Sequence, residues 1–512
     1  MAVTPPTPGE LSVLAGRYGF HFDEADLSSF AGLVQGNLAA HEAVERLYAR
    51  SAPVAPERKH WWPRENPLGA WYVRTEITPA GDGPLRGREI VIKDNIAVAG
   101  LPMMNGSRAV EGFVPRRDAT VVSRVLAAGG TIVGKAVCED LCYSGSSFTS
   151  ASGPVLNPWD RTRHAGGSSS GNAALLAAGE AELAIGGDQG GSVRMPAAFC
   201  GVVGHKPTHG LVPYTGAFPI ETTIDHLGPM TRTVRDAALL LSVLAGDDGY
   251  DSRQYRTPEP QDYTAAVEQD IKGLRVGVLT EGFGLAVSEP EVDDAVRAAV
   301  DQLAAAGAVV SEVSVPWHRE GLDVWTVIGT DGTARQMIDG YGYGMNVAGR
   351  YDPELMAHFA RGRREHADAL SDTLKTMILT GAFAVERYDM RHYAMARELA
   401  WELRAGYDAA LAEVDVLVLP TVPYVAKALP GPDATREERM VNALSMVGNT
   451  APFDTSGHPA ISVPAGSVGG LPTGLMIVGR RFDDATCLRV AAAYERQVGG
   501  FPSAAQDHRL TT

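Results

Sequence analysis

The chain is poor in cysteine and has no long hydrophobic run. Four cysteines in 512 residues are too few for a disulfide framework. Cys138 and Cys142 also lack the second CxxC or HxxxH pair that would indicate a zinc site. No run of 18 apolar residues occurs, and the first residues, MAVTPPTPGELSVLAG, lack the basic segment that begins a signal peptide. We therefore expect a cytoplasmic protein with no membrane span, no export signal and no bound metal.

Basic residues are also in the minority. The 45 Lys and Arg residues face 61 Asp and Glu residues, which gives a formal net charge of -16 at pH 7. Such a surplus of negative charge repels phosphate backbones and anionic lipids, so we expect neither nucleic acid nor a membrane as a partner. With 45% hydrophobic residues, and with 57 glycines and 32 prolines spread along the chain, the composition is that of a large globular protein.

Helix and strand signals alternate along most of the chain. Apolar residues at helical spacing predict helices between residues 7 and 49, before a Pro- and Trp-rich stretch over 51–71. A helix-rich stretch over 326–411 is expected to form an outer layer or the wall of a pocket. Between these regions the pattern predicts strands over 90–92, 131–134, 273–279 and 308–315, and helices over 119–128 and 290–306.

The β-α-β succession predicts an α/β fold. We expect a large mixed, mostly parallel β-sheet that is covered by helices on both faces. An N-terminal helical module is expected to precede it. The predicted organisation is a helical module and linker over residues 1–84, an α/β domain over 85–505 and a C-terminal tail over 506–512.

Two segments are rich in glycine and serine: AGGSSSG, residues 165–171, and GGDQGGSVR, residues 186–194. Glycines at this density let backbone N–H groups converge on an anion, so we interpret these segments as a candidate oxyanion hole. A flexible linker is the other interpretation, but an Ala/Leu-rich helix and the apolar stretch 195–203 follow the segments. Neither segment contains GxxxxGK[ST], and no GxGxxG follows a strand, so nucleotide binding is not indicated.

A serine nucleophile in such a turn needs a base within hydrogen-bond reach. Five histidines lie near the Gly-rich segments, but none sits in a GxSxG elbow, and we interpret them as structural: His164, His205, His209, His226 and His458. Lys93 directly follows the apolar run 90–92, at the strand end where α/β sites form. Burial there disfavours the charged ammonium and favours a neutral amine base, whereas most lysines at strand ends are solvated charges.

Three motifs, which contain Lys93, Gly166–Gly171 and Gly190–Arg194, resemble the amidase signature family. Members of that family use a lysine, a serine that follows a cis peptide bond and a second serine, and the separations of 75 and 24 residues here match this pattern. The resemblance covers about residues 85–501 and makes the domain over 85–505 the catalytic one. One position departs, since Ser170 stands where the family commonly has glycine.

Longer blocks support the resemblance. NPWD at 157, AAFCGVVGHKPTHGLVPYTG from 197 and TAPFDTSGHPAISVP from 450 occur in the same order as in the family. MMNGSR from 103, CEDLCYSGSSF from 138 and GDQGGS from 187 are most similar to the bacterial enantioselective amidases of this family, as are the N-terminal helices.

The resemblance implies a mechanism without a cofactor. Ser192 would be the nucleophile, Ser168 the proton relay and Lys93 the base of an amidase that forms an acyl-enzyme and releases a carboxylic acid and ammonia. Asp188 and Arg194 would hold the nucleophile loop by charge-assisted hydrogen bonds. The backbone N–H groups expected to stabilise the oxyanion are those of Gln189, Gly190, Gly191 and Ser192.

Substrate and partners are less closely specified by the sequence. Similar enzymes draw the wall of the substrate pocket from the regions of Phe148, Ile224 and Trp325, which would favour aromatic or branched acyl groups. Carbamates or aryl acylamides are alternative substrates. Another alternative is the ammonia-releasing subunit of a tRNA-dependent amidotransferase, against which the acidic balance and the N-terminal helices argue. We expect a small-molecule amide substrate and a homodimer.

Overall fold

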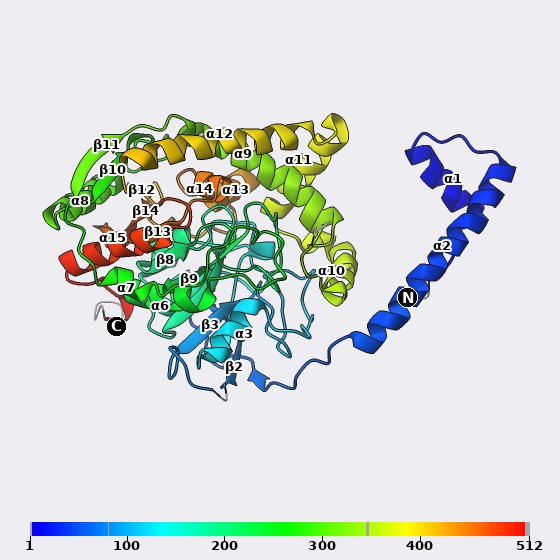
Figure 1. The fold of residues 1–512 in the computed structure, drawn as a ribbon, viewed down its shortest axis with the longest axis horizontal. Helices are drawn as coiled ribbons and strands as arrows, with labels where there is room; N and C mark the ends of the chain where they lie inside the picture. The colour runs from blue at the N-terminus through cyan, green and yellow to red at the C-terminus, as the bar shows by residue number, and fades with distance from the viewer. Residues whose placement is uncertain (1–2, 80, 345–347, 507–512) are drawn as a thin grey trace. The chain divides into compact units, whose positions relative to one another are not determined.

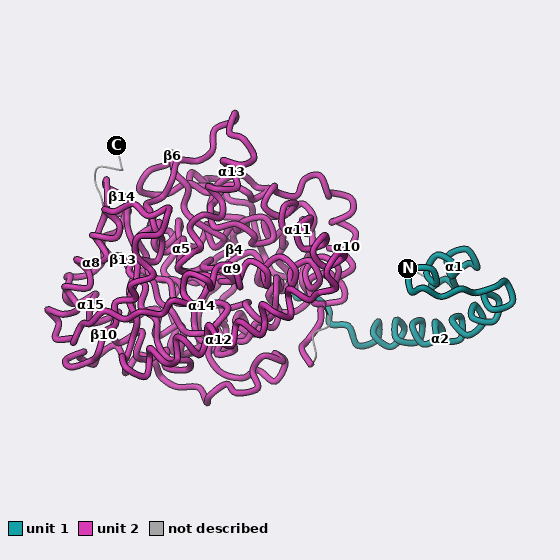
Figure 2. The backbone as a smooth tube through the Cα atoms, turned by 90° about the horizontal axis from the view of Figure 1, so that it is seen from above, with its two compact units in different colours: residues 1–56 teal, residues 57–512 magenta. Residues whose placement is uncertain are grey.

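The structure, a computed structural model, describes residues 3–79, 81–344 and 348–506. The chain divides into two compact units, residues 1–56 and 57–512 (Figure 2). The predicted C-terminal tail, residues 506–512, lies outside the described residues except for Gln506.

The first unit consists of two helices, α1 (Pro8–Arg17) and α2 (Glu24–Ser51). Each helix begins with a capping box, in which an N-cap side chain and the third helical residue satisfy each other's backbone N–H groups. Thr7 forms this box with Glu10, and Asp23 forms it with Asp26. The helices predicted between residues 7 and 49 are therefore confirmed.

The second unit begins earlier than the predicted boundary at residue 84. Strand β1 (His60–Trp61) pairs with β2 (Trp71–Ile77), and β2 pairs with β4 (Thr131–Ala136). Alternate residues of β2, beginning with Trp71, are buried, as in a strand with one face on a core. The compact unit starts at Glu57, because β1 lies within the Pro- and Trp-rich stretch and joins the sheet by pairing with β2.

One twelve-stranded sheet forms the centre of the second unit (Figure 1). A separate two-stranded sheet is made by β5 (Leu156–Asn157) and β6 (Asp160–His164). The order across the large sheet is β1, β2, β4, β3 (Glu89–Lys93), β7 (Leu183–Asp188), β9 (His226–Thr231), β8 (Val203–Lys206), β13 (Ala460–Val468), β14 (Leu471–Val478), β12 (Val416–Pro420), β10 (Arg275–Leu279) and β11 (Val309–Val313).

The sheet is mixed, as predicted, but it is not mostly parallel. Only four of the eleven pairings between its described strands are parallel, namely β3 with β4 and β7, and β10 with β11 and β12. The other pairings are antiparallel. The β-α-β signals that predicted a parallel sheet come from its two ends. In the middle, the short turn at Gly469 and Gly470 makes β13 and β14 an antiparallel hairpin.

Helices cover both faces of the sheet, which confirms that prediction. Along β3, Ile90 and Ile92 pack into one hydrophobic core and Val91 packs into another. The helices that contribute buried residues to the first core include α3 (Thr120–Ala127), α6 (Val234–Leu244), α8 (Pro290–Ala305) and α15 (Asp484–Gln497). Those that close the second are α4 (Ser170–Ala177) and α5 (Arg194–Cys200).

The remaining helices include the stretch predicted over 326–411. In chain order they are α7 (Thr264–Val267), α9 (Trp317–Val327), α10 (Pro353–Glu365), α11 (Asp372–Tyr388), α12 (Arg391–Glu413), α13 (Arg436–Leu444) and α14 (Ala451–Ser456). Two π-helical segments, 328–332 and 334–339, follow α9. No described helix combines the length and the apolar character that crossing a membrane requires.

Candidate active site

Lys93 is the last residue of β3, and its side chain is fully buried. Its Nζ lies 2.8 Å from Ser168 Oγ and donates to the carbonyl oxygen of Gly187 at 3.1 Å. Gly187 lies on the adjacent strand β7, which is parallel to β3. The sheet therefore places the lysine predicted as the base against the serine predicted as the relay.

Asp94, the next residue, does not share its carboxylate with Lys93. Its Oδ1 lies 2.6 Å from Lys135 Nζ, and its Oδ2 accepts from the backbone N–H groups of Met104 and Asn105 at 2.9 and 2.6 Å. Burial raises the pKa of Asp94, and Lys135 opposes that rise. Asp94 is therefore paired with Lys135 and not with Lys93.

Ser168 follows a cis peptide bond from Gly167, as the family resemblance predicts. A side chain at Gly167 would meet the backbone, because its Cβ would lie 2.0 Å from the carbonyl oxygen of Ser146. Ser170, which replaces the glycine common in the family, is the first residue of α4. The departure from the family pattern therefore lies in a helix. Ser170 Oγ donates to the carbonyl oxygen of Val137 at 3.4 Å.

Ser192 lies in the loop between β7 and α5, and it is 5% exposed. Its carbonyl oxygen accepts from the backbone N–H of Ser169 at 3.2 Å, which joins the loop to the segment that contains Ser168. Asp188 holds the same loop from inside. Its carboxylate accepts from the backbone N–H groups of Gly191 at 2.6 Å and Val193 at 3.0 Å.

Arg194 connects this loop to α14. Its Nε and Nη2 each donate to the carboxylate of Asp188 at 3.0 Å, and its Nη2 also donates to Asp454 at 2.6 Å. All three side chains are fully buried. Burial by itself raises the pKa of Asp188, but the charge of Arg194 outweighs it and holds that pKa well below its ordinary value. The predicted roles of Asp188 and Arg194 agree with these contacts.

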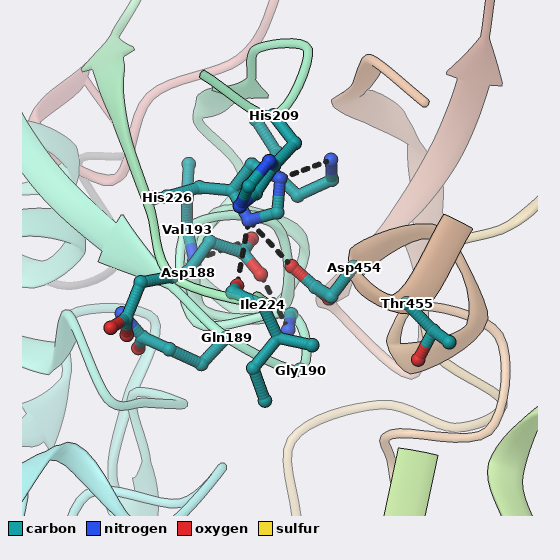
Figure 3. Close-up of polar contacts among 12 residues, drawn as sticks. Asp188, Gln189, Gly190, Val193, His209, Ile224, His226, Asp454 and Thr455 are labelled. Atoms are coloured by element: carbon teal, nitrogen blue, oxygen red, sulfur yellow. Dashed lines mark hydrogen bonds and ion pairs between the residues drawn. The ribbon is translucent and has the colours of Figure 1, made fainter. Parts of the chain in front are cut away.

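The network continues to the wall of the pocket (Figure 3). His226 Nδ1 lies 3.3 Å from Asp454 Oδ1 and 2.8 Å from the carbonyl oxygen of Ile224. Burial raises the pKa of Asp454 well above its ordinary value, and the nearby Asp188 adds to that rise. Sequence reasoning did not single out Asp454, although it lies within the quoted block TAPFDTSGHPAISVP.

One of the four predicted oxyanion donors is engaged elsewhere. The N–H of Gly191 donates to Asp188 Oδ1, so it is not available to a substrate in this structure. Gly191 has a φ of 130°, and a side chain there would also meet Thr450 Oγ1 at 2.3 Å from its Cβ. Three of the four predicted donors therefore remain candidates for the oxyanion hole, namely the backbone N–H groups of Gln189, Gly190 and Ser192.

A mostly apolar pocket contains Ser192. Two of the three predicted wall residues, Ile224 and Trp325, line it. Phe148 does not, since it lines a different cavity beside Ser371 and Arg439. The prediction for Phe148 is thus wrong. The pocket residues that sequence reasoning missed include Cys142, Tyr143, Met195, Ile220, Leu444 and Val447.

We expect Arg194→Met to destabilise the fold strongly. The change leaves the carboxylates of Asp188 and Asp454 buried without their shared cation, and the loss of one partner of a buried pair costs about 3–5 kcal/mol. Urea unfolding measures the change. The control is Arg335→Met, which breaks an exposed pair with Asp339 and should cost less than about 1 kcal/mol. Similar losses in both variants would contradict the structural role of Arg194.

Comparison with known proteins identifies the family. The family model described as Amidase matches residues 44–488. The chain is 54% identical to an enantioselective amidase of Rhodococcus rhodochrous over 507 residues, which are 98% of this chain and 97% of that protein. It is 39% identical to one of the subunits of the glutamyl-tRNA(Gln) amidotransferase of Exiguobacterium sibiricum, over 83% of this chain and 87% of that one.

Solved structures agree with the sequence relatives. The native peptide amidase of Stenotrophomonas maltophilia superposes with a TM-score of 0.69 at 31% identity, over 83% of this chain and 85% of that chain. With a family model that spans most of its length, and with a relative that matches it nearly from end to end, the chain belongs to the amidase signature family.

Proposed function

We propose that this protein hydrolyses carboxamides to carboxylic acids and ammonia through a Ser192–Ser168–Lys93 triad. The observation that carries the proposal is the 2.8 Å contact between Lys93 Nζ and Ser168 Oγ, next to a pocket that contains Ser192. Full burial of Lys93 beside Ser168 supports its place in the triad.

The proposed reaction has two halves. In the first, the neutral amine of Lys93 takes the proton of Ser168, which takes the proton of Ser192, and Ser192 Oγ attacks the amide carbonyl carbon. The oxyanion is stabilised by backbone N–H groups of the loop. Ser168 gives its proton to the nitrogen as the C–N bond breaks, and Lys93 gives its proton back to Ser168. Ammonia leaves. In the second half, water attacks the acyl-enzyme in the same way and releases the acid.

Aromatic or branched acyl groups fit the proposed site best. Ile224, Trp325 and Met195 give the pocket an apolar wall next to Ser192. A fixed wall of this kind distinguishes the substituents of a chiral acyl group, and we propose enantioselectivity on this basis and on the similarity to the Rhodococcus rhodochrous enzyme. Carbamates and aryl acylamides remain the alternative substrates.

An amidotransferase role is the second candidate, since a relative at 39% identity belongs to such an enzyme. A panel of benzamide, acetanilide, a carbamate and glutamine, tested with the purified protein alone, separates the candidates. Hydrolysis of benzamide without a partner supports the stand-alone amidase. Glutaminase activity that depends on a second protein would favour the amidotransferase.

We also propose a cytoplasmic homodimer. The four cysteines are free and buried, in keeping with a reducing compartment. The first unit exposes large apolar side chains that an interface between two copies would cover. Among the described residues of this unit, those of at least 60% exposure are Val13, Tyr18, Leu33, Val44, Leu47 and Val54.

An acyl-enzyme predicts acyl transfer. Hydroxylamine that is added with benzamide should compete with water for the acyl group and yield benzohydroxamate, whose iron complex is coloured. Mass spectrometry of a quenched reaction should find a benzoyl adduct on the peptide that contains Ser192. The proposal fails if no hydroxamate forms at saturating hydroxylamine, or if the adduct lies on another residue.

A further inference from the structure

Gln189, which lines the same pocket as Ser192, has a buried amide oxygen without a partner. The residue directly follows Asp188 (Figure 3), is 4% exposed and lines the pocket that contains Ser192. Among the described residues, no hydrogen-bond donor reaches its Oε1. Because buried polar groups in folded proteins are almost always hydrogen-bonded, this oxygen indicates a ligand that supplies a donor.

The orientation of the amide is fixed by Tyr214. Gln189 Nε2 donates to Tyr214 Oη at 2.9 Å, and Tyr214 Oη donates to the carbonyl oxygen of Phe218 at 3.2 Å. A phenol has one proton, so Tyr214 accepts from Gln189 while it donates to Phe218. This chain of hydrogen bonds identifies the nitrogen of the amide and leaves the oxygen as the free end.

The backbone of Gln189 is held as well. Its carbonyl oxygen accepts from Trp325 Nε1 at 2.7 Å, and Trp325 also lines the pocket. The residue is thus fixed at both the main chain and the amide nitrogen before any substrate binds. An acceptor held in this way loses little conformational entropy when it forms a hydrogen bond.

We propose that Gln189 Oε1 accepts a hydrogen bond from the –NH2 group of the substrate and so selects primary carboxamides over esters. The inference rests on the proposed amidase function with Ser192 as the nucleophile. An amide offers N–H donors at the leaving group, whereas an ester has an oxygen there with lone pairs only. With an ester bound, Gln189 Oε1 stays unpaired in a buried site, and this disfavours the ester.

The test compares Gln189→Met with the wild-type enzyme on benzamide and methyl benzoate, which share one acyl group. Methionine keeps the length of the side chain and removes the acceptor. We expect kcat/KM for benzamide to fall about tenfold or more, and kcat/KM for methyl benzoate to change less than about twofold. If the ester turns over too slowly, its inhibition constant against benzamide replaces kcat/KM and should stay the same or decrease.

Two further variants complete the test. Tyr214→Phe removes the acceptor of the amide nitrogen and should lower the ratio of amide to ester activity in the same direction. Gln302→Met, on the exposed face of α8, should leave both activities unchanged. An equal loss for both substrates in Gln189→Met, or no loss for either, would overturn the inference. Neither result touches the proposed function, which has its own test: it fails if Ser192→Ala still hydrolyses benzamide.

Discussion

Ser192→Ala should lose nearly all amidase activity while the fold stays intact. The change removes the nucleophilic hydroxyl and adds no bulk to a pocket in which Ser192 is already 5% exposed. Loss of the nucleophile of a serine hydrolase lowers kcat by about 10⁶-fold, and we expect a fall of several orders of magnitude here. Release of ammonia from benzamide, measured at high enzyme concentration, gives the residual rate.

The matched control is Ser467→Ala. Ser467 lies on the exposed end of β13, far along the chain from the catalytic segments, so its loss should leave the rate unchanged. Thermal unfolding of both variants should lie close to that of the wild type. Residual activity above a few per cent in Ser192→Ala would reject Ser192 as the nucleophile and, with it, the acyl-enzyme.

Local elements could be predicted from the sequence because their signals are local. The strand that ends at Lys93, the helix α8 and the strand β11 all lie within a residue or two of the predicted ranges. Each is marked by its own apolar pattern and by glycine or proline at its ends. The proportion of antiparallel strands could not be obtained in this way, because the direction of β9 between β7 and β8 depends on partners far away in the sequence.

In the active site, too, features with local sequence signals could be predicted and features that depend on long-range contacts could not. The triad could be located from motifs of a few residues each, with the help of the family resemblance. The ion pair of Asp94 could not be predicted, because its partner Lys135 lies 41 positions later in the sequence, on the strand next to β3. Phe148 was expected in the pocket only because its segment of the sequence corresponds to a pocket wall in similar enzymes. In the structure, Phe148 lines another cavity. Asp454 joins the nucleophile loop only through tertiary packing.

Substitution of Lys93 should also impair amidase activity severely, although less than substitution of Ser192. In Lys93→Ala the relay has no terminal proton acceptor, and general base catalysis is worth about 10²–10⁴-fold in rate. Methylamine, which can enter the space left by the side chain, should restore part of the activity of Lys93→Ala when ammonia release is measured. It should not restore Ser192→Ala. The exposed Lys272→Ala serves as the control for the loss of a lysine.

Lys93→Arg separates a base from a positive charge. A guanidinium keeps its proton throughout the accessible pH range, so it can donate to Ser168 Oγ but cannot take its proton. We therefore expect Lys93→Arg to be as inactive as Lys93→Ala, and methylamine should not restore it because the space stays filled. Substrate binding, measured by inhibition with benzoate, should persist if the pocket is intact. Near-native turnover in Lys93→Arg would mean that position 93 supplies charge alone, and the Ser-Ser-Lys mechanism would then have to be abandoned.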